Sequence, residues 1–258
     1  MTRPLRAHAE LTPPTPVDVP VTMSIGAHGE AVTLWADPAG RAALRDGGHP
    51  VPVWVTVQHQ YTMMSTVRIE ALPLTAPQVQ SLPDDQVLVV GRGRPNALVF
   101  DAAGELVRAA HVGDGVTHVA ATPAGNVWVA NADGLVRFAA DLTPQWTAPA
   151  RVLMVNVHGE TAWAGHHPGS PIVRVAGDVL TSWDNPVGGS AAMLVGADAV
   201  ALVGGDRVIL GQLTGAAFEP VAEVRLALPA QARLFGRDDV LHVFAGTTWY
   251  RMDLDDIM

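Results

Sequence analysis

Two arginines stand two positions apart in the segment GRGRPN, which covers Gly91–Asn96. If the segment is extended, alternation directs the side chains of Arg92 and Arg94 to the same side of the backbone. Guanidinium groups placed in this way can hold a carboxylate or a phosphate through paired hydrogen bonds. The pattern therefore predicts a position for an anion, although paired arginines are also common on solvated surfaces.

Two adjacent histidines, His166 and His167, are a second candidate. Imidazoles titrate near neutral pH and can bind metals or move protons. On extended backbone, however, neighbouring side chains point to opposite sides, and the chain has no HExxH motif that would supply a zinc site. Asn131 and Asp133, in the short segment ANADG, add polar groups in another expected loop. The predicted ligand-binding residues are Arg92, Arg94, Asn131, Asp133, His166 and His167.

A metal site is the alternative interpretation. Calcium or zinc in a hydrolase or lyase needs several carboxylate or imidazole ligands that converge on one point. The residues that could supply them are Asp114, Asp133, Asp184 and either His118 or His166. Serine-hydrolase chemistry has no support, because the chain contains no GxSxG segment. We therefore expect no cofactor, keep calcium or zinc as the alternative, and identify no catalytic residues.

The composition excludes several other functions. The chain has no cysteine, so disulfides and thiolate metal sites are absent. All 16 basic residues are arginine, and the formal net charge is −9. Nucleic-acid binding depends on a basic surface, so we expect no nucleic acid among the partners. We expect instead a protein or a small molecule as the partner.

Residues Met1–Pro20 contain no apolar core of a signal peptide. No apolar stretch reaches the roughly 18–20 residues of a membrane-spanning helix. We therefore expect a cytoplasmic protein that does not interact with membranes.

These polar residues are carried by a repeat of short apolar strands, which returns about every 40 residues, a period typical of radial or solenoidal folds. Gly, Pro, Asp and Asn separate the strands, as expected at turns. Each unit has up to four strands, labelled A to D from the inside outwards. The six expected units are Val17–Pro73, Pro77–Val112, Val116–Pro149, Arg151–Pro186, Ser190–Leu228 and Gln231–Asp253.

Six units of this size predict an all-β fold, a six-bladed β-propeller in one domain over residues 1–258. A pair of β-sandwiches is the alternative, but it would not require the same pattern six times. Helices should be few, with one short turn at Ala39–Asp46. Units three and four match at Trp128 and Trp163 and at Arg137 and Arg174. We interpret the tryptophans as packing between blades and the arginines as either solvated or bridging between blades.

The last unit supplies only three strands before the chain reaches Met258. Leu5–Leu11 precedes the first unit, separated from it by the proline-rich segment TPPTPVDVP. Proline suits a connection because it cannot serve a central strand. We therefore predict that Leu5–Leu11 forms the outermost strand of the sixth blade and closes the ring.

The run LPDDQVLVVGRG, together with NALVFDAAGELVRAAHVGDGVTHVAATPAGNVWV, TAWAGHHPGSPIVRV and LHVFAGTTWYRM, resembles a family of uncharacterised bacterial proteins. The resemblance covers about Val17–Met252 and implies a six-bladed propeller of the NHL or SMP-30-like type. Its motifs mark blades and bring no activity with them. The segment ANADG is shorter than the equivalent in that family, which would reduce any site formed there.

In a propeller, the D–A and B–C loops share one face, and loops on a rigid scaffold are natural binding positions. Alignment of the A strands places the following residues near the channel axis: Thr22, Ser24, Gln78, Gln80, His118, Met193, Gln231 and Arg233. None is a carboxylate. We therefore predict a non-catalytic scaffold that binds a protein or a small polar or anionic ligand on this face. The alternatives are a metal-dependent hydrolase or lyase of the SMP-30 or lactonase type, and a degenerate member without a ligand.

Overall fold

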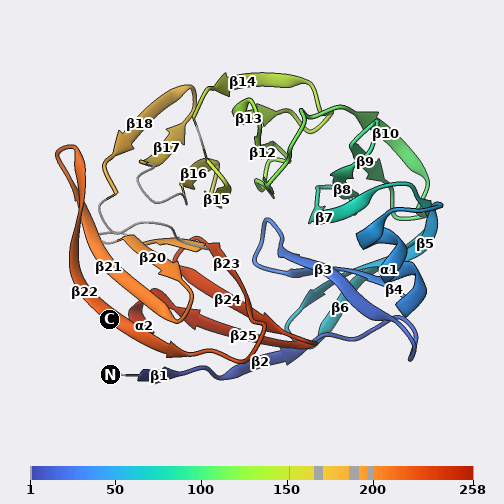
Figure 1. Ribbon diagram of the computed structural model, residues 1–258, viewed down its shortest axis with the longest axis horizontal. Coiled ribbons are helices and arrows are strands. Elements are labelled where there is room, and N and C mark those ends of the chain that lie inside the picture. The colour runs from blue at the N-terminus through green and yellow to red at the C-terminus, as the bar shows by residue number, and fades with distance from the viewer. Residues whose placement is uncertain (1, 151, 166–170, 186–191, 197–199, 258) are drawn as a thin grey trace.

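The structure is a computed structural model that describes residues 2–150, 152–165, 171–185, 192–196 and 200–257. Six sheets, each with four antiparallel strands, stand around a common axis, as Figure 1 shows. The A strands contact one another in the cyclic order β3, β7, β11, β15, β19, β23 and back to β3. This closed cycle confirms the predicted six-bladed β-propeller.

The first three blades follow the chain in A-to-D order. Blade 1 consists of β3 (Val19–Ile25), β4 (Ala31–Ala36), β5 (Val51–His59) and β6 (Thr62–Leu72). Blade 2 consists of β7 (Thr75–Ser81), β8 (Val87–Arg92), β9 (Ala97–Phe100) and β10 (Leu106–Ala110). Blade 3 consists of β11 (His118–Ala121), β12 (Val127–Asn131), β13 (Gly134–Phe138) and β14 (Pro144–Ala148).

The second half of the ring has the same plan. Blade 4 consists of β15 (Met154–His158), β16 (Thr161–Gly165), β17 (Ile172–Ala176) and β18 (Val179–Trp183). Blade 5 consists of β19 (Ala192–Val195), β20 (Val200–Gly204), β21 (Arg207–Thr214) and β22 (Ala217–Ala227). Blade 6 consists of β23 (Arg233–Arg237), β24 (Val240–Ala245), β25 (Thr248–Asp253) and β2 (Ala7–Glu10).

The hydrophobic core is divided among the seams between neighbouring blades. Six clusters of buried side chains are found in the described residues, and each joins two adjacent blades around the ring. Successive side chains of a strand point to opposite faces, so an inner strand that is apolar throughout can serve two seams at once. The apolar residues 127–130 of β12 are all buried for this reason.

The N-terminal segment closes the ring as predicted. β2 pairs antiparallel with β25, and Ala9 and Leu11 are buried at the seam between blades 6 and 1. A shorter strand, β1 (Thr2–Pro4), pairs in parallel with β22 of blade 5, which the sequence did not predict. The N-terminus is therefore attached to two blades.

The repeated tryptophans are packed between neighbouring blades, as predicted, and Arg137 bridges blades 3 and 4. Trp128 is buried in the cluster between blades 3 and 4, and the Arg137 guanidinium lies 5.7 Å from the centre of its ring. Arg137 also donates to the backbone of Gly177 at 2.8 Å and pairs with Asp178 at 2.8 Å in blade 4. Arg174 lies over Trp163 at 5.7 Å in the next blade.

Polar side chains on the A strands are used to join blades at the channel. The Gln80 amide donates to Val119 O at 3.0 Å in blade 3. Arg237, at the end of β23, is 4% exposed and donates to Ala121 O at 2.9 Å and to Ala27 O at 2.6 Å. Because these carbonyls belong to blades 3 and 1, the Arg237 side chain crosses the channel at its A–B loop end.

The B–C connection of blade 1 contains a helix, α1, over Pro38–Asp46. It covers the short turn expected at Ala39–Asp46. Asp37 caps the helix, because its carboxylate accepts a hydrogen bond from Gly40 N at 2.6 Å, and proline stands in the first turn. A second helix, α2 (Leu254–Ile257), ends the described chain. Within the described residues, neither helix has the length and apolar composition needed to span a membrane.

Candidate functional site

The face that carries the D–A and B–C loops, called here the loop face, contains two neighbouring cavities. The first, the α1 cavity, has a volume of about 650 Å³ and lies beside the helix at the mouth of the channel. Its walls come from blades 1, 2 and 6. The residues that line it are Val19, Val21, Thr22, Pro38, Arg41, Ala42, Leu44, Arg45, Ala76, Pro77 and Arg233.

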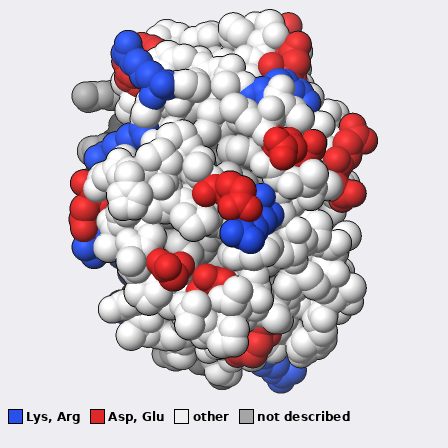
Figure 2. Space-filling model, turned by 90° about the vertical axis from the view of Figure 1, so that its right-hand side faces the viewer, with Lys and Arg blue, Asp and Glu red and all other residues white. Residues whose placement is uncertain are grey.

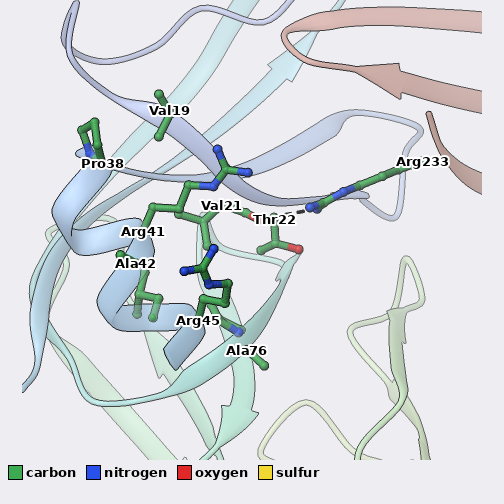
Figure 3. A pocket seen from close by; sticks show the side chains of 11 residues that line it. Val19, Val21, Thr22, Pro38, Arg41, Ala42, Arg45, Ala76 and Arg233 are labelled. Atoms are coloured by element: carbon green, nitrogen blue, oxygen red, sulfur yellow. Dashed lines mark hydrogen bonds between the residues drawn. The ribbon is translucent and has the colours of Figure 1, made fainter. Parts of the chain in front are cut away.

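Three arginines reach the α1 cavity from two elements. Arg41 and Arg45 stand four residues apart on α1, so they lie on the same side of the helix. Arg233 extends from the start of β23 towards β3, where it donates to Val21 O at 3.5 Å. Figure 3 shows Arg41 and Arg45 extending from the helix and Arg233 arriving from the opposite side. No carboxylate is found among the described residues that line the cavity.

The charges in the α1 cavity are unevenly compensated. Asp46 forms two hydrogen bonds with Arg45, each 2.7 Å long, and these raise the pKa of Arg45. Arg41 has no such carboxylate partner in the described part of the chain. Burial lowers the pKa of Arg233, and the positive charge of Arg41 lowers it further. Arg41 and Arg233 therefore repel each other across an open space.

The second cavity, called the β8 cavity, has a volume of about 540 Å³ and lies between blades 2 and 3. Arg92 is exposed at the end of β8 and lines it, together with Asp114. Asp114 is already engaged, at 3.4 Å by Arg94 and at 3.4 Å by the His111 imidazole. Asn96 is buried and ties the wall together by donating to Gly113 O at 2.6 Å.

One residue, Ala76, lines both cavities. It lies in β7 where the pairing with β8 shifts register between Thr75 and Gln78. Its φ of 47° is in the left-handed region, although it has a Cβ and precedes Pro77. Both properties normally favour other conformations, so this position is strained. Strain of this kind often occurs at binding sites, where the surroundings hold the backbone in place.

The remaining predicted ligand-binding residues have different surroundings. Arg94 is 3.4 Å from Asp114 and does not line either cavity. Asn131 is buried, donates to Val112 O at 2.8 Å and accepts from Asp133 N at 2.9 Å, so it supports the connection between blades 2 and 3. Asp133 is exposed beside it. His166 and His167 lie outside the described residues.

The residues of the alternative metal site come from separate places. His118 begins the inner strand β11, and Asp184 follows β18 at the outer side of blade 4. Asp114 belongs to the connection between blades 2 and 3 and is paired with Arg94. Across the described residues, no three His, Asp or Glu side chains gather closely enough to hold a metal ion. The described residues therefore do not fit a bound calcium or zinc ion.

Arg41 was not singled out in the sequence, and Arg233 was placed only near the axis. A signal for Arg41 was present, because an arginine pair with a spacing of four residues in a helix shares one face. The sequence gives no sign that this pair lies close to Arg233, because their proximity depends on the contact between blades 6 and 1.

The opposite face has a cavity of different character. It has a volume of about 510 Å³ and is lined by residues that include Glu30, Asp84 and Asp85. Glu30 is 5% exposed and accepts hydrogen bonds from the Ser81 hydroxyl and from His28 N. An anion is therefore favoured on the loop face and disfavoured here. On the outer side of the molecule in Figure 2, acidic and basic side chains are interspersed, without a broad basic patch.

Comparison with known proteins gives a fold and no family. No protein-family model and no curated protein sequence matches the chain. Kluyveromyces lactis Hsv2 is similar with a TM-score of 0.59 and 9% identity, over 92% of this chain and 74% of that one.

Two enzymes are also among the similar structures. Virginiamycin B lyase from Staphylococcus aureus has a TM-score of 0.55 and 12% identity, over 95% of this chain and 86% of that one. A gluconolactonase from Xanthomonas campestris has a TM-score of 0.52 and 12% identity, and the match covers 97% of this chain and 98% of that one. At such low identity, these likenesses show the propeller fold alone.

Proposed function

We propose that this propeller is a binding scaffold that takes a small anionic ligand in the α1 cavity. The observation that carries the proposal is the meeting of Arg41, Arg45 and Arg233 around one concave space without a lining carboxylate. Guanidinium groups are well suited to carboxylates and phosphates, because each presents several fixed N–H donors.

Electrostatics gives the physical reason. Asp46 compensates the charge of Arg45, whereas Arg41 and Arg233 present like charges to the same cavity and repel each other. A bound anion would remove this cost and gain charge-assisted hydrogen bonds. The Thr22 hydroxyl and the apolar side chains of Val21 and Ala42 line the same space, so the ligand would combine an anionic group with a small apolar or polar body.

Isothermal titration with inorganic phosphate and phenyl phosphate tests the proposal. We expect the wild-type protein to bind at least one of these probes. Arg233→Gln and Arg41→Gln should each weaken binding by about tenfold or more, because each removes a charge-assisted contact worth about 1.5–3 kcal/mol. Binding should also weaken as the salt concentration rises.

The matched control is Arg225→Gln, on the outer strand β22, where Arg225 pairs with Asp206 at 2.9 Å away from both cavities. It removes the same net charge and should leave probe binding unchanged. Equal losses in Arg225→Gln and Arg233→Gln would reduce the effect to net charge and contradict the proposed site. Failure of the wild-type protein to bind any small phosphate or carboxylate would also contradict it.

The similar structures favour a second candidate, a hydrolase or lyase, because they include a lyase and a gluconolactonase. In this alternative, a loop-held calcium or zinc ion would draw ligands from Asp114, Asp133, Asp184 and His118. The described residues do not gather such a set, so we derive no reaction step from it.

Thermal unfolding tests this second candidate. The protein would be melted as purified, after treatment with EDTA, and after calcium or zinc is added back. A ligand that binds only the folded state stabilises it by about 2.7 kcal/mol at a concentration one hundred times its Kd. The melting temperature of a metal-dependent enzyme would fall in EDTA and return when one of the metals is added back. The melting temperature of the anion-binding scaffold would change in neither condition.

A further inference from the structure

The α1 cavity and the β8 cavity adjoin each other at one residue, since Ala76 lines both. Apolar residues line both cavities, Pro77 in the α1 cavity and Val90 and Val116 in the β8 cavity, and the polar side chain of Gln78 lies beside them in the β8 cavity. Arginines stand beyond the junction on both sides. Arg41 and Arg233 line the first cavity, and Arg92 lines the second.

Arg92 is available for a ligand in a way that Arg94 is not. Arg94 is paired with Asp114 at 3.4 Å. Asp114 lines the β8 cavity, so this ion pair also offsets the negative charge of the cavity wall. Arg92 is exposed and forms no ion pair with the residues that the structure describes. A single anionic group in the α1 cavity would leave Arg92 unused.

The strained backbone at the junction is consistent with a shared use of the two cavities. Ala76 has a φ of 47° where β7 departs from regular pairing with β8. Its side chain is a single methyl group, so a ligand that passes over it meets little bulk. A bulge beside a binding site commonly redirects the strand in this way.

We infer that the ligand is an elongated dianion with an apolar middle, with one anionic group among Arg41, Arg45 and Arg233, the other on Arg92, and the chain between them crossing Ala76. This inference rests on the proposed function, because the first anionic group is the ligand of the α1 cavity. The chemical class comprises α,ω-dicarboxylates and their phosphate counterparts with an extended spacer.

Isothermal titration with dicarboxylates from succinate to sebacate, each compared with the monocarboxylate of the same carbon number, tests the inference. We expect one range of chain lengths to bind about tenfold or more tightly than its monocarboxylates. Arg92→Gln should reduce that dicarboxylate to the affinity of the monocarboxylate and leave the monocarboxylate unchanged. Arg233→Gln should weaken both, and Arg225→Gln neither.

The outcomes separate the two proposals. If monocarboxylates and dicarboxylates bind equally at every length, or if the preference for dicarboxylates survives Arg92→Gln, the dianion inference is wrong and the anion site in the α1 cavity stands. If no carboxylate or phosphate probe binds the wild-type protein, the proposed function itself fails. Arg92 is exposed, so the variant should fold, and its melting curve checks this.

Discussion

The imidazole of His242 is 2% exposed and accepts a hydrogen bond from the Trp249 indole N–H at 3.2 Å on its Nδ1. Burial lowers the pKa of His242 from 6.5 to about 3, and the positive charge of Arg251 adds to the effect. His8, which packs edge-on against Trp249, also has a lowered pKa because of burial. Both imidazoles are therefore neutral in the folded protein at pH 7.

Acidification should destabilise the protein through His242. The unfolded chain takes up this proton near pH 6.5, whereas the folded protein resists it until about pH 3. The stabilisation is therefore complete above pH 6.5 and is lost progressively as the pH falls towards 3, at up to about 1.4 kcal/mol per pH unit for one proton. Urea unfolding between pH 6.5 and 5 measures the slope, and His242→Gln should reduce it by about one proton. Equal slopes in the two proteins would show that His242 does not titrate as described.

Arg41 should cost the unliganded protein some stability. Asp46 compensates Arg45, so the repulsion that is relieved is mainly that between Arg41 and Arg233, and Arg41→Gln should be about 0.2–1 kcal/mol more stable than the wild type in low salt. Salt screens exposed charges, so the difference should shrink in high salt. Urea midpoints at the two salt concentrations provide the measurement. A loss of stability in Arg41→Gln would contradict the repulsive cluster.

At the scale of elements, the N-terminal strands determine how the ring is held closed. Deletion of residues 1–12 removes β2 and the buried side chains of Ala9 and Leu11 from the seam between blades 6 and 1. We expect a sharp fall in melting temperature. Leu11→Ala alone should cost about 2–5 kcal/mol, the usual range for a buried leucine.

A shorter deletion is the control for this prediction. Removal of residues 1–4 takes away only β1, which pairs in parallel at the outer edge of blade 5. It should lower the melting temperature much less than deletion of residues 1–12. If the two deletions have equal effects, closure by β2 does not dominate the stability of the ring.

The fold could be predicted at this scale because each blade repeats one local pattern. Strands such as β12 are apolar on both faces, and glycine and aspartate mark the turns between strands. The matching positions of Trp128 and Trp163 allowed the third and fourth repeats to be aligned with each other in the sequence. The strand β1 was not predicted, because a segment of three residues that includes a proline shows no strand pattern.

The site was less predictable for a physical reason. Arg92 is a loop-face arginine in both the prediction and the structure, because it is the last residue of β8, where the strand meets the B–C connection. Arg94 was assigned the same role, and its contact with Asp114 of the next connection could not be read from its own segment. The meeting of Arg41 with Arg233 requires the first and last blades to be in contact, so it becomes visible only once the ring is closed.

At the scale of the whole molecule, Arg237 links blade 6 both to its neighbour, blade 1, and to blade 3 across the ring. Its two hydrogen bonds, to Ala121 O at 2.9 Å and Ala27 O at 2.6 Å, join blade 6 to blades 3 and 1. Arg237→Met would leave both carbonyls without their charged donor, so we expect a loss of about 2–4 kcal/mol in the free energy of unfolding. Arg237→Lys, which keeps the charge but not the two-armed geometry, should lose less. Chemical denaturation measures both, and an unchanged methionine variant would contradict the cross-link.

The Arg237 link also restrains how the ring can open. Its two acceptors belong to blades 3 and 1, so any motion that spreads these blades from blade 6 at the A–B loop end must first release the guanidinium from a carbonyl. The ring is therefore pinned at that end by this side chain, in addition to the strand pairing of β2 with β25 at its outer rim.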